Sequence, residues 1–134
     1  MEDLTTDQII GIATGYRNMA RALNEFQVRR WPEFTHEQQL DVNAYQNSLL
    51  NRAHDLQSLL VRPAFKYPLD IATDIVQATD TARNSLKIIR NLTVALNVGA
   101  IMVALASYVA RANLRGIQTA LRELRELVML EEEK

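Results

Sequence analysis

The sequence predicts an all-α protein, a bundle of three to four long helices. Apolar residues recur at alternating spacings of three and four along most of the chain, which is the periodicity of an amphipathic helix. Only four glycines and three prolines interrupt the 134 residues, and no strand-like alternation stands out. Since 48% of the residues are apolar and 23% are charged, we expect residues 1–134 to form a single helical domain with a real core.

The first helix is expected within residues 1–31, as an N-terminal helix or arm. Thr5 and Gln8 have the spacing of a capping box, in which each side chain satisfies a free backbone amide. An apolar stripe follows at helical spacing: Ile9, Ile12, Tyr16, Met19, Leu23 and Phe26. The helix is expected to end at Trp31-Pro32, because the residue before a proline is pushed out of helical geometry.

The second helix is expected over residues 35–61. Thr35 and Gln38 form another capping box at its start. Its apolar stripe consists of Val42, Tyr45, Leu49, Ala53, Leu56 and Leu60. Pro63 and Pro68 then bracket a short linker, because proline does not continue a helix.

Residues 69–130 are expected to form a C-terminal helical hairpin. One apolar stripe runs from Ile75 to Leu96 and another from Leu114 to Val128. The only turn signal between them is Asn97-Val98-Gly99, so the apolar turn of the hairpin is placed at residues 97–99. The alternative is one helix from Asp70 to about Leu130, which would be roughly 90 Å long at about 1.5 Å per residue.

Residues 81–122 contain six basic side chains and no acidic one, although the net charge of the whole chain is −1. On a continuous helix, Arg111, Arg115, Gln118, Arg122 and Arg125 share one face. Arg83, Lys87 and Arg90 form a shorter row by the same rule, and a hairpin can bring both rows onto one surface. The alternative is a solvated face in which Glu123 and Glu126 pair with neighbouring arginines.

Rows of guanidinium groups can follow a phosphate backbone and release counterions on binding. We therefore expect backbone contacts to nucleic acid, most simply double-stranded DNA. The residues expected to make these contacts are Arg17, Arg21, Arg83, Lys87, Arg90, Arg111, Arg115, Arg122 and Arg125. Binding is expected to be non-specific, since no base-reading module accompanies the rows.

Residues 91–110 are uncharged and mostly apolar. Their length matches the roughly 20 residues that span a bilayer core, but a turn at residues 97–99 leaves arms too short to cross. Such an apolar hairpin tip needs a cover, from another subunit or from lipid. The expected contact residues are Leu96, Val98, Ile101, Met102 and Leu105. The alternative is that this segment is buried within a monomeric bundle.

Residues that carry catalytic chemistry are poorly represented. The chain has no cysteine, which excludes disulfides and thiolate zinc sites. Glu33 and His36 have the spacing of a carboxylate-bridged metal site, but no second such pair is present. No metalloprotease helix motif, phosphate loop or nucleophile elbow occurs. We expect no enzymatic activity, no cofactor and no metal.

The overall pattern resembles the major coat proteins of filamentous archaeal viruses. The resemblance rests on a short helical chain with arginine rows, an apolar hairpin and helix-packing glycines. Arg17, Arg21, Arg29 and Arg30, which precede the Trp31-Pro32 break, would match the N-terminal arm of that family, and Leu69 to Leu130 would match most of its bundle. The family wraps double-stranded DNA, often as two related subunits, and several members carry a lipid envelope. The near-neutral net charge departs from what a DNA-wrapping coat suggests.

The function expected from these features is that of a structural coat-type subunit that polymerises and wraps nucleic acid. Its partners would be copies of itself or a related subunit, and its location would be the virion. Two alternatives remain. One is a membrane-associated helical-hairpin protein, and the other is a helical protein–protein adaptor without nucleic-acid binding, which would be cytoplasmic.

Overall fold

The fold is all-α, as predicted, but it has five α-helices rather than three or four. The computed structural model describes residues 2–58, 64–65 and 70–132. The helices are α1 (Thr6–Arg29), α2 (His36–Gln57), α3 (Ile71–Ser85), α4 (Leu92–Ala110) and α5 (Leu114–Glu132), with a 3-10 helix η1 (Trp31–Glu33). Two short strands, β1 (Glu2–Asp3) and β2 (Ala64–Phe65), pair antiparallel with Glu2 opposite Phe65.

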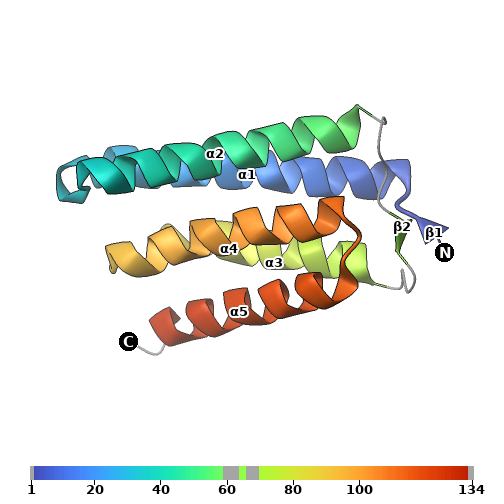
Figure 1. The fold of residues 1–134 in the computed structure, drawn as a ribbon. Coiled ribbons are helices and arrows are strands. Elements are labelled where there is room, and N and C mark those ends of the chain that lie inside the picture. The colour runs from blue at the N-terminus through green and yellow to red at the C-terminus, as the bar shows by residue number, and fades with distance from the viewer. Residues whose placement is uncertain (1, 59–63, 66–69, 133–134) are drawn as a thin grey trace.

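The five helices run alternately up and down and pack as a ring (Figure 1). Each helix packs mainly against two others, in the order α1, α2, α4, α5, α3 and back to α1. As a result α3 runs parallel to both of its neighbours, α1 and α5, and α2 runs parallel to α4, whereas the α1–α2 and α4–α5 contacts are antiparallel. The core lies inside the ring, where all five helices contribute fully buried side chains: Tyr16, Leu49, Ile75, Met102 and Ile117.

Both predicted capping boxes are confirmed. The Thr5 amide donates to Gln8 Oε1 over 2.8 Å, and the Gln8 amide donates to Thr5 Oγ1 over 3.1 Å. Thr35 and Gln38 repeat the arrangement at the start of α2, with distances of 2.9 and 3.1 Å. α2 ends at Gln57 rather than at residue 61, and the linker bracketed by Pro63 and Pro68 lies outside the described residues.

A buried polar network joins α1 to α2. Gln27 is only 3% exposed. Its Nε2 donates to Gln39 Oε1 and to Asn43 Oδ1, the latter over 3.1 Å, and its Oε1 accepts from Gln46 Nε2 over 2.8 Å. Both donor hydrogens of Gln27 and its acceptor are thereby satisfied. The network favours one register between the two helices, because a slip would leave the buried amide without partners.

The expected hairpin turn at residues 97–99 is wrong, because these residues lie inside α4. A Cβ added at Gly99 would lie 3.0 Å from Tyr45 Cδ2 and 3.3 Å from Leu23 Cδ2. The glycine thus permits close packing of α4 against α1 and α2, and it does not mark a turn. A single helix from residue 70 to 130 is also wrong, since the chain turns both before and after α4.

The first of these turns follows α3, which ends at Ser85. Asn91 then caps the start of α4, where its Oδ1 accepts from the amides of Thr93 over 2.9 Å and Val94 over 3.3 Å. An asparagine at this position satisfies backbone donors that have no partner within the helix. The expected continuous stripe from Ile75 to Leu96 is therefore divided between α3, the turn and α4.

The second turn lies at Arg111–Asn113 and has the hydrogen bonds of a Schellman motif. The Asn113 amide donates to the Tyr108 carbonyl over 2.9 Å, and the Ala112 amide donates to the Val109 carbonyl over 3.1 Å. Ala112 adopts a φ of 52°, in the left-handed region that glycine usually fills at this position. Asn113 Oδ1 also accepts from the Gly116 amide over 2.9 Å and so caps the start of α5.

We expect Ala112→Gly to stabilise the protein by about 0.5–1 kcal/mol. The left-handed conformation costs a residue with a Cβ roughly 1–2 kcal/mol, and the greater freedom of glycine in the unfolded chain offsets part of that gain. The control is Ala110→Gly in the last turn of α4, which is expected to cost up to about 1 kcal/mol. Chemical denaturation of both variants measures the difference, and a loss of stability in Ala112→Gly would contradict the assigned turn.

Candidate functional site

A strip of basic residues runs along the exposed side of α5. We call Arg115, Gln118, Arg122 and Arg125 the α5 strip; all four side chains are exposed. Arg115 and Arg125 are ten positions apart, so the strip covers about 15 Å of helix. This part of the predicted arginine row thus keeps its expected spacing on one helical face.

Arg111 does not continue the α5 strip, because the turn at Arg111–Asn113 separates it from α5. Its Nη2 donates to Ser107 Oγ over 3.2 Å, and its guanidinium lies 5.4 Å from the centre of the Tyr108 ring. The predicted face of five residues from Arg111 to Arg125 is therefore corrected to four. The error came from assuming one continuous helix through residue 111.

Two acidic residues of α5 lie on the side toward α4, and one of them, Glu126, also adjoins the strip because it is four positions after Arg122. Glu123 and Glu126 line a groove between α4 and α5, together with Asn97, Ala100 and Ile101. Within the described part of the chain, the ion pairs are Arg30–Glu33 and Asp80–Arg83. The expected alternative, in which Glu123 and Glu126 neutralise the neighbouring arginines, has no ion pair to support it among these residues.

The second predicted row, Arg83, Lys87 and Arg90, does not join the α5 strip. Arg83 is in the last turn of α3 and the other two lie in the turn that follows. Since α3 and α5 run parallel, that turn lies at the end of the bundle where α5 ends, opposite Arg115 (Figure 1). The expectation of one surface that carries both rows is therefore corrected.

Arg29 and Arg30 have structural partners that the sequence did not reveal. Arg29 Nη2 donates to the Leu86 carbonyl over 3.1 Å, and Arg30 Nη2 donates to the Arg90 carbonyl over 2.7 Å. Arg30 Nη1 also reaches the Ile89 carbonyl at 3.4 Å. These guanidinium groups satisfy carbonyls beyond the end of α3 that have no helical partner. They fasten the end of α1 to the turn between α3 and α4.

Arg30 is further held by Glu33, which accepts hydrogen bonds from its guanidinium. The hydrogen bond lowers the pKa of Glu33 below its ordinary value, because it favours the charged carboxylate. Both Arg29 and Arg30 also lie over the Phe26 ring, at 5.6 and 5.1 Å from its centre. Glu33 thus has a structural partner in Arg30.

The basic residues predicted on α1 lie on a different side of the ring from the α5 strip. Arg21 is exposed, whereas Arg17 is half-buried and donates to Gln57 Oε1 of α2. α1 packs mainly against α2 and α3, and α5 packs mainly against α3 and α4. Arg17 and Arg21 therefore do not extend the α5 strip.

The residues predicted to contact another subunit or lipid are mostly internal. Val98, Met102 and Leu105 are fully buried in the core of the chain, and Leu96 and Ile101 are partly buried against it. The prediction is corrected for the three buried residues, which do not reach the surface. The cause is again the assumed turn at residues 97–99, which would have turned this helix into an exposed tip.

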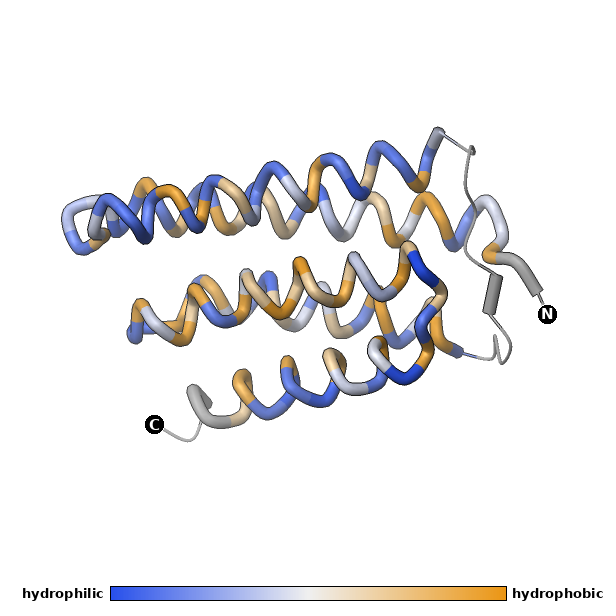
Figure 2. The backbone as a smooth tube through the Cα atoms, in the orientation of Figure 1, coloured by the Kyte–Doolittle hydropathy of each residue, from blue (hydrophilic) through white to orange (hydrophobic). Residues whose placement is uncertain are grey.

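α4 nevertheless has an uncharged outward face. Thr93 and Asn97 are exposed, and Ala100, Ala104 and Ser107 are half-buried along the same side of the helix. Figure 2 shows that α4 is apolar along most of its length, whereas apolar and polar residues alternate along α1 and α2. Leu92–Ala110 is long and apolar enough to cross a membrane by length and composition alone, and 39% of its most apolar window is buried in this chain.

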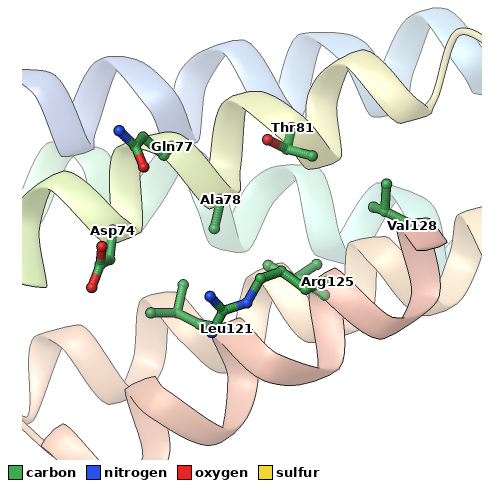
Figure 3. Close-up of a pocket in the computed structure, with 8 residues that line it drawn as sticks. Asp74, Gln77, Ala78, Thr81, Leu121, Arg125 and Val128 are labelled. Carbon is green, nitrogen blue, oxygen red and sulfur yellow. The ribbon is translucent and has the colours of Figure 1, made fainter.

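A small groove separates the parallel helices α3 and α5 (Figure 3). Its volume is about 150 Å³. Ala78, Leu121, Leu124 and Val128 supply apolar lining, and polar residues line the rest: Asp74, Gln77, Thr81 and Arg125. Arg125 is the one member of the α5 strip that lines it, and Figure 3 shows its side chain lying beside Leu121.

Nothing in the described residues forms a site for a metal ion, since no group of three or more His, Cys, Asp or Glu side chains there could hold one. Tyr16 is fully buried, and burial raises the pKa of its hydroxyl above the ordinary value. Its hydroxyl has no hydrogen-bond partner among the residues described. Tyr16 packs within the main cluster of buried apolar side chains, so we assign it to the core.

Comparison with known proteins assigns no family to this chain. The chain matches no protein-family model, no curated protein and no solved structure. The resemblance to filamentous virus coat proteins therefore rests on helical architecture and arginine pattern, and the function has to be argued from the geometry described above.

The structural arginines and the α5 strip are expected to respond differently to the same substitution. Arg30→Gln removes charged hydrogen bonds to two carbonyls and to Glu33, so we expect a loss of about 1–3 kcal/mol. Arg122→Gln changes an exposed side chain and is expected to alter stability by less than about 0.5 kcal/mol. Urea denaturation tests both, and equal losses would contradict this division.

Proposed function

We propose that this chain is a structural subunit of a larger assembly, whose copies contact one another through the outward face of α4. The observation that carries the proposal is an α-helix of 19 residues with no ionisable side chain from Leu92 to Ala110 other than Tyr108. α2 and α5 cover only its flanks. A surface without charge on a helix this apolar is typical of a protein contact site.

The side chains on this face suit a second helix. Ala100 and Ala104 are small and four positions apart, so another backbone can approach closely between them. Thr93 and Asn97 supply exposed hydrogen-bonding groups on the same side, which a protein partner can satisfy and a hydrocarbon layer cannot. These features favour a protein cover for α4 over a lipid cover.

The neighbours of α4 argue against insertion of this face into a bilayer. Glu123 and Glu126 of α5 line the groove beside it, and Asn47 and Asn51 are exposed on α2. Placing α4 in the hydrocarbon core would take these groups with it, which is costly for charged side chains. The membrane-associated hairpin also loses its structural basis, because residues 97–99 are helical.

In this proposal the subunit coats nucleic acid through the α5 strip. Arg115, Arg122 and Arg125 are exposed on one side of the ring, and Glu123 and Glu126 line the groove toward α4. Guanidinium groups suit phosphate because they donate two parallel hydrogen bonds. The proposed contact set is thus narrower than the set predicted from the sequence, because six of the predicted residues lie outside the α5 strip: Arg17, Arg21, Arg83, Lys87, Arg90 and Arg111.

The assembly is tested by placing a charge on the outward face of α4. Asn97→Arg combined with Ala104→Arg should prevent association, because like charges would meet in an uncharged contact. Light scattering during size-exclusion chromatography should then show the mass fall from that of an assembly to 15.2 kDa. Gln77→Arg with Asn84→Arg, at exposed positions on α3, is the control and should leave the assembly intact. A native chain that stays monomeric at high concentration would contradict the proposal.

Nucleic-acid binding is tested by its salt dependence. Each phosphate neutralised adds about 0.9 to the slope of log affinity against log salt on B-form DNA. Arg115→Gln with Arg122→Gln should therefore flatten the slope by about two and weaken binding equally for unrelated sequences. The matched control, Arg21→Gln with Lys87→Gln, removes the same charge at exposed positions off the strip and should leave the slope unchanged. Equal slopes for the native chain and the α5 variant would assign the strip to a solvated face.

A further inference from the structure

Seven large apolar side chains are exposed among the described residues, and three of them come from the end of α1, η1 and the turn between α3 and α4. Val28, Trp31 and Ile88 are 64%, 57% and 60% exposed, respectively. Val28 is in the last turns of α1, Trp31 begins η1, and Ile88 lies in the turn after α3. This end is opposite the N-terminus in Figure 1.

Hydrogen bonds join the two segments that carry these residues. Arg29 and Arg30 donate to the carbonyls of Leu86, Ile89 and Arg90, so residues 28–31 adjoin residues 86–90. Phe26 and Phe34 pack beneath them with their ring centres 6.2 Å apart. The exposed side chains are therefore presented by a supported surface, which we call the end patch and define as Val28, Arg29, Trp31, Lys87, Ile88 and Arg90.

The charge of the end patch is positive. Arg29, Lys87 and Arg90 are exposed, and two of the nearby acids have basic partners of their own. Glu33 binds Arg30, and Asp80 lies 3.7 Å from Arg83. Glu25, one turn before Arg29 on α1, and Glu37, in the first turn of α2, are exposed near the patch. Within the patch itself, three basic side chains accompany three exposed apolar ones.

We propose that the end patch binds the surface of an anionic lipid bilayer. Tryptophan favours the interface between headgroups and acyl chains, and exposed aliphatic side chains such as Val28 and Ile88 gain by entering the acyl boundary. Lys87 and Arg90 face the negative surface potential of anionic lipids, which attracts basic residues near the membrane. Nucleic acid offers basic residues the same charge, but it offers Val28 and Ile88 no hydrocarbon layer.

The single tryptophan of the chain reports directly on this surface. With vesicles of about one-third phosphatidylserine in phosphatidylcholine, Trp31 emission should shift to shorter wavelength and be quenched by brominated acyl chains. Pure phosphatidylcholine vesicles should give neither effect. Lys87→Gln should weaken binding to the anionic vesicles about fivefold, the value for one basic residue near such a surface.

Two double variants distinguish binding through the end patch from non-specific binding through other exposed apolar side chains. Val28→Ser with Ile88→Ser keeps Trp31 as the reporter and should abolish the shift at the same lipid concentration. Ile10→Ser with Leu50→Ser removes two apolar side chains that are 47% and 45% exposed away from the patch, and it should bind as the native chain does. Equal loss in both variants would overturn the proposal, as would a shift produced by double-stranded DNA but not by anionic vesicles. If Lys87→Gln binds the anionic vesicles as tightly as the native chain does, the proposed electrostatic attraction to the lipid surface is wrong.

Discussion

The need to cover an uncharged helix of 19 residues shapes the whole bundle. α4 turns Val98, Met102 and Leu105 into the core and packs its flanks against α2 and α5, which places it between two amphipathic helices. Two glycines make these contacts close. Gly99 admits Tyr45 of α2, and a Cβ at Gly116 of α5 would lie 2.5 Å from the Tyr108 ring of α4. α5 covers one flank of α4, and α3 packs against the other side of α5. The ring closes because α1 packs against both α3 and α2.

Local chemistry explains which parts of the fold could be predicted. The apolar stripes and the capping boxes at Thr5 and Thr35 involve residues within one turn of helix, so sequence reasoning located both helix starts. Gly99 was misread because a glycine that makes room for another helix looks the same in sequence as one that makes a turn. The turn between α4 and α5 has an alanine, Ala112, at its left-handed position. An alanine gives no sequence signal of a turn. Asn91 and Asn113, which cap α4 and α5, were the signals that could have found both boundaries.

The arginines show why the candidate site was only partly predictable. Helical spacing correctly placed Arg115, Arg122 and Arg125 on one exposed side, because all three lie within α5. The same rule failed for Arg111 and for Arg83 to Arg90, where the helices end. Arg29 and Arg30 bind carbonyls nearly sixty positions away in the sequence, a relationship that no local pattern contains. Residue type indicated the capacity to bind oxygen anions or carbonyls, and only the tertiary structure distinguishes between these partners.

The near-neutral net charge of the chain carries little weight against binding to an anionic partner. A polyanion responds to the charges within about one Debye length, which is about 8 Å at physiological ionic strength. Glu126, four positions after Arg122, and Asp74, in the same groove as Arg125, lie within that range of the α5 strip, whereas Glu123 lies toward α4. The acids of α2 lie farther still, across the ring. The α5 strip and the end patch are therefore local groups of basic residues with acids at their edges, in a chain whose sixteen acids slightly outnumber its fifteen Lys and Arg residues.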